Sequence, residues 1–187
     1  MQRDEIAAYI NEGIQARSLI DSDIVYSIGM KIAERIKKGG KLVLFGNGGS
    51  AADSQHIAAE LVGRFEKERK PLPAMALHTN TSSLTAIAND YSYDAVYSRQ
   101  VEAFCSHGDA VIGLSTSGNS PNVVKGLEAA KKLGCITVAL TGASGGKSAE
   151  VADYTIKIAS KRTSIIQECH IAIGHIISKI IEDFVFA

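Results

Sequence analysis

Several features that would assign this chain to a specialised class are missing. No apolar run in the 187 residues is long enough to span a bilayer. The start, MQRDEIAAYI, carries early charges and no long apolar run, so we expect no signal peptide. Twenty basic side chains balance twenty acidic ones, which leaves no net field to attract nucleic acid or an anionic membrane. We therefore expect neither partner.

Cysteine is also scarce. The three cysteines, Cys105, Cys135 and Cys169, are odd in number and have no CxxC spacing, which favours reduced, buried thiols in a cytoplasmic protein. No repeat, low-complexity tract or linker divides the sequence. We predict one domain over residues 1–187, with a helical oligomerisation arm at 1–38 and an α/β core at 41–187.

Short apolar segments alternate with amphipathic ones after residue 40, as is typical of parallel βαβ units. We predict an α/β three-layer sandwich with helices on both faces of a five-stranded parallel sheet. The predicted strands are 42–45, 74–78, 110–114, 135–140 and 154–158. The arm reads as two amphipathic helices that divide near Ser22, with a cap at 21–23. One sheet cannot cover both faces of this arm, so we expect subunits to associate.

The stretch from Lys41 to Arg64 predicts a buried strand, a glycine turn at 46–49 and a helix. Its glycines let backbone N–H groups approach a ligand, and Ser50 or Ser54 is a candidate helix cap. The turn also contains G-x-G-x-x-A, which overlaps a dinucleotide fingerprint. The acidic residue that this fingerprint needs would fall in the charged run 64–70, which reads as a solvated helix end and loop, so we do not expect NAD.

A second loop, Ser115-Thr116-Ser117-Gly118-Asn119-Ser120, follows the third strand and precedes a helix that starts at Pro121. Its hydroxyls and the free N–H groups of the helix suit a phosphate monoester. No GxxxxGK[ST] motif is present, so the phosphate would be held and not transferred. The alternative is a Ser/Thr-rich turn that only caps the helix.

His56 and Glu60 stand at i and i+4 on the first core helix, so both point from one face. Such a pair binds a divalent metal, moves protons or simply forms a surface hydrogen bond. The last helix, predicted over 163–184, carries Gln167 and His175 among many isoleucines. His175 is either functional or a satisfied core histidine. Asn89-Asp90 interrupts a predicted helix, and spacing does not decide whether it caps a turn or reaches the site.

These segments together resemble the phosphoheptose isomerases, enzymes of the sugar isomerase (SIS) fold. The resemblance rests on GNGGSAADSQHIAAELVGRF, LTAIANDYSYDAVYSRQVEA, GLSTSGNSPNV, ALTGASGGK and IQECHIAIGHI, which span most of the chain. It implies isomerisation of sedoheptulose 7-phosphate to D-glycero-D-manno-heptose 7-phosphate for surface polysaccharides, in a cytoplasmic homotetramer. It implies Glu60 and His175 as the catalytic pair, and zinc, one per subunit, at His56, Glu60, Gln167 and His175. It also implies substrate contacts at Asn47, Gly48, Gly49, Glu60, Asn89, Asp90, Ser115, Thr116, Ser117, Ser120 and Gln167.

Two departures from the family pattern concern substrate contacts. The family often has an acidic residue and Thr-Ala-Arg before Ile-Gln-Glu, where this chain has Arg162-Thr163-Ser164-Ile165-Ile166-Gln167, and Asn80 stands where aspartate is common. The zinc set also has a geometric difficulty, because Gln167 and His175 are eight residues apart, about 12 Å along a straight helix. To share an ion they must converge, lie at a distorted helix start or come from different subunits.

Two rival functions remain open at this stage. One is a non-catalytic SIS-fold regulator that resembles the replication-initiator-associating proteins, which lose the catalytic Glu and His. The other is an isomerase or sensor of another sugar phosphate, which the serine loop alone does not exclude.

Overall fold

The computed structural model describes residues 2–187 and contains a five-stranded sheet in which every strand pair is parallel. The strand order is β2-β1-β3-β4-β5, so the predicted fold class is confirmed. In order along the chain, the strands are β1 (Leu42–Gly46), β2 (Ala74–Ala76), β3 (Ala110–Ser115), β4 (Ile136–Gly142) and β5 (Tyr154–Ile158). From β1 the chain first adds β2 on one side of the sheet and then adds β3, β4 and β5 on the other side. Ligands of such sheets bind at this switch point, beyond the carboxyl ends of the strands.

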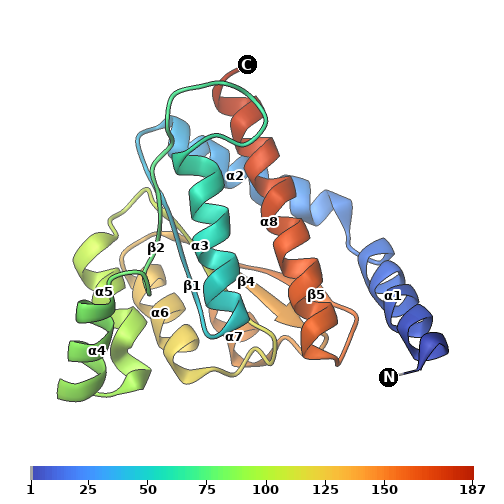
Figure 1. Cartoon of the computed structure of the whole chain (residues 1–187). Helices are drawn as coiled ribbons and strands as arrows, with labels where there is room; N and C mark the ends of the chain where they lie inside the picture. Colours follow the sequence, from blue (N-terminus) through green and yellow to red (C-terminus); the bar gives the residue numbers. More distant parts are fainter. Residues whose placement is uncertain (1) are drawn as a thin grey trace.

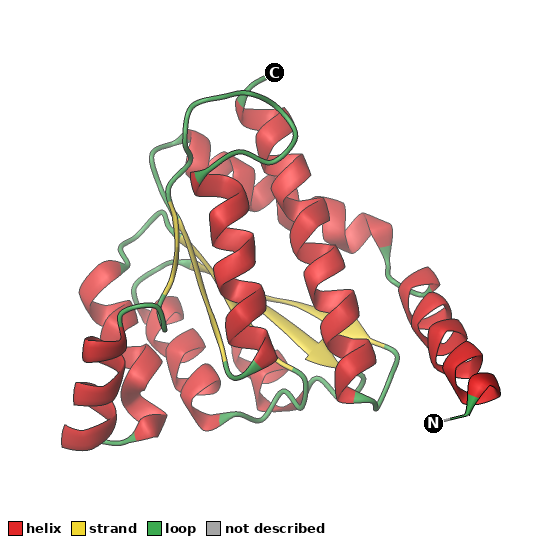
Figure 2. Cartoon of the chain, in the orientation of Figure 1, coloured by secondary structure: helices red, strands yellow, loops and turns green. Residues whose placement is uncertain are grey.

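Helices cover both faces of the sheet and form three layers (Figures 1 and 2). One face packs against α2 (Ser22–Lys37), α3 (Gly49–Val62) and α8 (Thr163–Val185). The other packs against α5 (Val96–Phe104) and α6 (Pro121–Lys132), flanked by α4 (Thr81–Asp90), the short 3-10 turn η1 (Tyr93–Ala95) and α7 (Gly146–Val151).

Alternation along the strands explains why there are two cores. In β1, Leu42 and Leu44 point into the core beneath α3 and α8, whereas Val43 and Phe45 point into the core beneath α5 and α6. Successive side chains of a strand face opposite ways, so a strand buried on both faces needs a continuous apolar run. The three cysteines are free and buried, as predicted.

The N-terminal helix α1 (Arg3–Ser18) lies at the side of the molecule and leaves most of its surface open (Figure 1). Only Gly13 and Ala16 are buried in it. Helix α2 starts as predicted, with the Asp21 carboxylate accepting hydrogen bonds from the N–H groups of Asp23 and Ile24. No helix among residues 2–187 is long and apolar enough to cross a membrane.

Two local expectations were wrong. Asn89 and Asp90 do not interrupt a helix but form the last turn of α4, which begins earlier than expected because Asn80 caps it. Neither Ser50 nor Ser54 caps α3. Its N-cap is Gly48, with a φ of 56°, and both serines are buried inside the helix.

The charged run 64–70 is a mostly exposed loop, as predicted. Arg69 is the exception, because its side chain is only 2% exposed and pairs with the buried Glu182 of α8. The sequence does not predict this contact, because Glu182 lies more than one hundred residues away from Arg69 in the chain.

Candidate active site

The loop that follows β1 is held rigidly at Asn47. The Asn47 and Asn122 amides each donate to the other at 2.9 Å, and the Tyr93 hydroxyl donates to Asn47 Oδ1 at 3.1 Å. Tyr93 and Asn122 are therefore positioning residues that the sequence reading missed. No local pattern reveals them, because their contacts with Asn47 exist only after the end of β1, α6 and η1 come together. Gly48 and Gly49 are exposed beside this anchor.

The loop that follows β3 gathers three serine hydroxyls. Ser115 Oγ lies 3.0 Å from Ser120 Oγ and 3.4 Å from Ser117 Oγ. Ser120 is the N-cap of α6, but its hydroxyl does not bond to the first turn of the helix, where the N–H of Val123 donates instead to Asn122 Oδ1 at 2.9 Å. Pro121 is the first helical residue, as predicted. Convergent hydroxyls at the start of a helix form an arrangement that suits a phosphate group.

The rest of this loop is fixed from behind. The carbonyl of Thr116 accepts the N–H of Gly142, and the carbonyl of Gly118 accepts the N–H of Ser148. Gly118 has a φ of 68° and lies so close to Gly145 that any added Cβ would clash with its carbonyl. Only glycine therefore fits at the tip of the loop.

Asn89 and Asp90 are exposed at the end of α4, where the amide of Asn89 donates to the carboxylate of Asp90 at 2.8 Å. Within residues 2–187, neither side chain forms a hydrogen bond or an ion pair with the serine loop or with α3. The segment is tied to the site through Tyr93, three residues after Asp90, which bonds to Asn47. The predicted contact of Asn89 and Asp90 with substrate stays a prediction.

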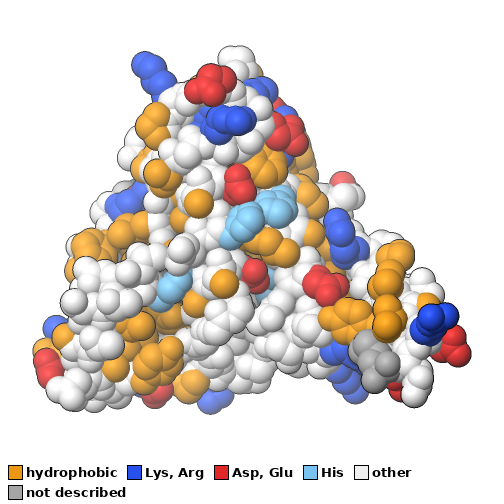
Figure 3. Space-filling view, in the orientation of Figure 1, with side chains coloured by type: hydrophobic (Ala, Val, Ile, Leu, Met, Phe, Trp, Pro, Cys, Tyr) orange, Lys and Arg blue, Asp and Glu red, His pale blue; other side chains and the backbone are white. Residues whose placement is uncertain are grey.

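Helices α3 and α8 bring three functional candidates into one cluster. His56 Nε2 lies 2.9 Å from Glu60 Oε1 and 3.1 Å from His175 Nε2. Gly174 makes this approach possible, since its missing Cβ leaves room for Ile57 of α3. The imidazole of His56 is about half exposed, and histidine is visible at the surface of this face in Figure 3. His175 is half-buried, so it is not a core histidine.

Hydrogen bonding alone does not explain the close approach of these three side chains. A ring nitrogen carries one hydrogen or one lone pair in the ring plane, so His56 Nε2 cannot make a separate strong hydrogen bond to both neighbours. A divalent cation would instead accept one lone pair from each of the three groups, whose ligand atoms all lie within 4.8 Å of one another. Zinc bonds of about 2.0 Å put tetrahedral ligands about 3.3 Å apart, close to the 2.9 Å and 3.1 Å that separate His56 Nε2 from its two neighbours. The three residues therefore fit a metal ion.

Gln167, the fourth predicted ligand, does not join this cluster within one chain. Its amide packs against Gly49, where an added Cβ would lie 2.7 Å from Gln167 Nε2. His175 lies eight residues further along α8, a rise of about 12 Å. The structure thus puts Gln167 with the glycine loop at the start of α3 and puts the metal-competent cluster near the other end of that helix.

Asp53 lies on α3 between these two groups. Its Oδ2 atom is buried and has no hydrogen-bond partner. Burial raises the pKa of this carboxyl to about 6, and nearby His56 partly offsets the rise. A second unusual group is His170 on α8, which is fully buried with an unpaired Nδ1 atom and its Nε2 atom 3.3 Å from the Thr141 carbonyl. Burial lowers the pKa of His170 to about 4, so its imidazole is neutral.

Comparison with known proteins identifies relatives of this chain. The family model described as SIS domain matches residues 9–142, which defines the class of fold. A probable phosphoheptose isomerase of Thermoplasma volcanium is 61% identical over 180 residues, covering 96% of this chain and 92% of that protein. A phosphoheptose isomerase of Aquifex aeolicus is 58% identical over 154 residues, covering 82% of this chain and 81% of that one.

Solved structures extend the comparison. The phosphoheptose isomerase GmhA of Neisseria gonorrhoeae superimposes with a TM-score of 0.91 at 39% identity, covering 97% of this chain and 98% of that chain. This chain therefore belongs to the phosphoheptose isomerase family of SIS-domain proteins.

Proposed function

We propose that this protein isomerises sedoheptulose 7-phosphate to D-glycero-D-manno-heptose 7-phosphate through an enediol, for heptose that enters surface polysaccharide. The observation that carries the proposal is the cluster of His56, Glu60 and His175, in a family member that also has the serine loop. A non-catalytic regulator of this fold would have no need for a carboxylate and an imidazole that converge in this way.

Proton transfer is assigned to the catalytic pair. Glu60 removes a proton from C1 of the ketose and returns it to C2, while His175 moves protons at the neighbouring oxygens and assists ring opening. The Ser115, Ser117 and Ser120 hydroxyls and the start of α6 hold the 7-phosphate, which supplies orientation from a group that does not react. Thr116, Asn47, Gly48, Gly49, Asn89, Asp90 and Gln167 complete the proposed substrate contacts.

Zinc, one ion per subunit, is the metal we propose for the cluster. His56, Glu60 and His175 would hold it, and Gln167 would be the fourth ligand. The ion would polarise the substrate carbonyl and stabilise the charge of the enediolate. Glu60 is a weaker base while it binds a metal, so its two roles compete.

Distances along α3 support a site shared between subunits. Eleven residues separate Gly49 from Glu60, a rise of about 16 Å, whereas the six C–C bonds of a heptose extend at most about 9 Å. The serine loop lies at the Gly49 end, because Asn47 pairs with Asn122 of α6. We therefore propose that the loop and Gln167 of one subunit face the His56–Glu60–His175 cluster of a neighbouring one, in a homotetramer.

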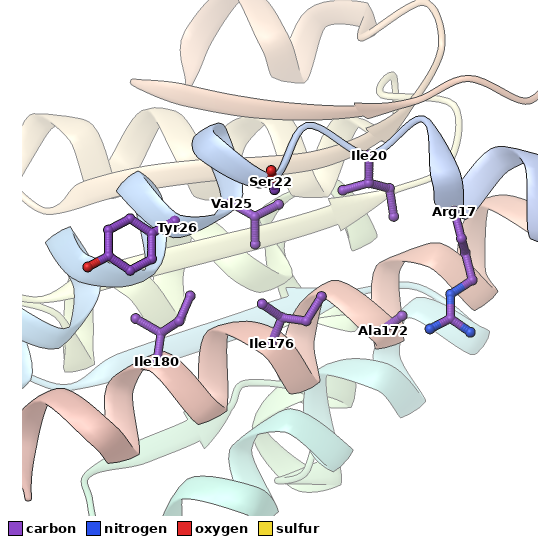
Figure 4. A pocket seen from close by; sticks show the side chains of 8 residues that line it. All are labelled: Arg17, Ile20, Ser22, Val25, Tyr26, Ala172, Ile176 and Ile180. Atoms are coloured by element: carbon purple, nitrogen blue, oxygen red, sulfur yellow. The ribbon is translucent and has the colours of Figure 1, made fainter.

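Exposed apolar surface on the arm is consistent with such assembly. Ile10, Ile14 and Leu19 are 55%, 60% and 68% exposed, too much apolar surface for a helix that stays in water. Next to them lies an apolar groove of about 450 Å³, in which Ile20 and Val25 face Ile176 and Ile180 of α8 (Figure 4). A second copy of the chain is the occupant we propose for this surface. The cytoplasm is the compartment in which its sugar-phosphate substrate would be found.

Separation of ketose from aldose after incubation with sedoheptulose 7-phosphate tests the proposal. We expect the heptose product with wild-type protein, stimulation by zinc after chelator treatment, and no product with His175→Ala. Absence of product from the wild type both with and without zinc would reject the function. Turnover of another sugar phosphate instead would assign the protein to the rival substrate class.

A further inference from the structure

A buried carboxylate holds the loop that follows α3. Glu182 of α8 is fully buried, and its Oε2 atom accepts the N–H groups of Glu66 and Lys67 at 3.0 Å each. Its Oε1 atom accepts the N–H of Phe65 at 3.3 Å and Arg69 Nε at 2.9 Å. Burial disfavours the ionised carboxyl, but these donors outweigh it and lower the pKa of Glu182. The carboxylate is thus the centre of an ordered loop.

The guanidinium of Arg69 closes the end of α3. Arg69 Nη2 donates to the carbonyl of Glu60 at 2.8 Å, and Arg69 Nη1 donates to the carbonyl of Leu61 at 2.7 Å. The last carbonyls of a helix have no partner within the helix, and a forked cation satisfies them well. One of the bonded carbonyls belongs to the proposed catalytic base itself.

Phe65 links the same loop to the second catalytic side chain. Its ring stacks on the imidazole of His175, with centroids 5.8 Å apart and an interplanar angle of 23°. His175 and Glu182 are seven residues apart, so they lie on the same face of α8 two turns from each other. Glu182 therefore fixes the backbone of the residue whose ring covers His175.

We infer that Arg69, Glu182 and Phe65 form a latch that positions the catalytic pair: Arg69 fixes the Glu60 end of α3, and Phe65 fixes the ring of His175. The three are positioning residues, since none of them belongs to the cluster itself. This role rests on the proposed function of Glu60 and His175. The loop 64–70, whose sequence is typical of solvated surface, would thus affect the rate of the reaction.

The chain offers a matched control at Asp109. This carboxylate is also buried and accepts two backbone N–H groups, of Lys41 and Ser106, together with the Lys41 ammonium at 2.6 Å. None of these partners belongs to α3 or α8. Asp109→Asn therefore removes a similar buried ion pair without touching the loop that covers His175, and it separates positioning from general loss of stability.

Steady-state kinetics of Glu182→Gln, Phe65→Leu, Phe65→Tyr and Asp109→Asn test the latch. We expect kcat to fall about tenfold in Glu182→Gln and Phe65→Leu with KM changed less than about twofold, because misplacement of a reacting group costs rate more than binding. Phe65→Tyr keeps the stacked ring and should retain the wild-type kcat. Phe65→Leu keeps the ion pair, so it stays informative if Glu182→Gln fails to fold.

Imidazole resonances of histidine-labelled protein give a readout that does not depend on turnover. We expect the His175 signal to shift in Glu182→Gln and Phe65→Leu and to stay in place in Asp109→Asn. Unchanged kcat and an unchanged His175 signal in the first two variants would overturn the latch, as would an equal loss of kcat in Asp109→Asn. A wild type that does not turn over rejects the proposed function instead, while the His175 signal still decides whether the latch positions that ring.

Discussion

The two ends of α3 build the proposed site by different means. At the start, the exposed Gly48 and Gly49 leave space for a ligand, and hydrogen bonds from Asn122 and Tyr93 hold the adjacent Asn47 in place. Towards the end, side chains from distant segments meet: His56 and Glu60 come from α3, and His175 comes from α8. The first region is suited to hold a ligand, and the second is suited to move protons.

This difference predicts a split between binding and rate. Interactions that a substrate makes equally in its ground state and transition state affect KM, whereas groups that act on the reacting atoms affect kcat. The loop end should therefore control KM and the cluster end should control kcat. Variants at each end, and between the two, test the division.

The largest effect is expected at Glu60. Glu60→Gln should lower kcat by about 10³-fold, within the usual range for the loss of a general base, and leave KM nearly unchanged. Steady-state kinetics measure both constants. Gln55→Ala, an exposed change on the same helix, is the control. Equal activity in Glu60→Gln and Gln55→Ala would remove Glu60 from the mechanism.

The next largest effect is expected in the pH dependence of stability, which the neutral, buried His170 controls. Its pKa is about 4 in the folded protein and about 6.5 in the unfolded chain, so protonation favours unfolding. The stabilising contribution is complete above pH 6.5, and about 3 kcal/mol of it is lost as the pH falls towards 4. Urea unfolding at pH 7.5 and pH 4.5 should show a smaller pH-dependent loss in His170→Gln than in wild type. Parallel losses in both proteins would contradict the buried neutral histidine.

A smaller effect is expected in the serine loop. Ser120→Ala should raise KM about tenfold, the usual value of a hydrogen bond to a charged group, with kcat within about threefold of wild type. Inorganic phosphate should inhibit this variant more weakly than wild type. A variant with unchanged KM and reduced kcat would reverse the roles of the two regions.

The smallest effect should come from Asp53, midway between the two regions. The pKa of Asp53 in the folded protein is about 6, above the ordinary value of 3.8. The free energy of unfolding therefore decreases as the pH rises from about 4 to about 6, and the loss stays constant at higher pH. Asp53→Asn removes that cost. After discounting for partial exposure, we expect the variant to gain about 1 kcal/mol of unfolding free energy at pH 7.5 relative to pH 4. Chelator-treated protein should be used, and an equal difference at both pH values would show that Asp53 ionises normally.

Much of the architecture could be predicted from local patterns. Continuous apolar runs such as 42–45 predict strands buried on both faces, and Pro121 marks the start of its helix. The pair His56 and Glu60 is also legible, because residues four apart share one face of a helix. Assignment of His175 to the same cluster came from family resemblance and not from spacing.

The remainder depends on contacts between segments that are far apart in the sequence. Arg69 looks solvated within its charged run, and only the packing of α8 brings Glu182 to it. The sequence around Asn47 likewise does not predict its hydrogen bonds with Asn122 and Tyr93. Gln167 and His175 share α8, but Gln167 contacts Gly49 whereas His175 contacts His56. The two side chains therefore do not meet at one metal site within a single chain.

The most direct test of the account is isomerisation of sedoheptulose 7-phosphate in heavy water, followed by NMR of the aldose product. The proton that Glu60 takes from C1 exchanges with solvent before Glu60 protonates C2, which predicts deuterium at C2 in product made by the wild type and none at the other carbons. Product that forms without any deuterium at C2 would contradict a solvent-exchanging base in an enediol mechanism.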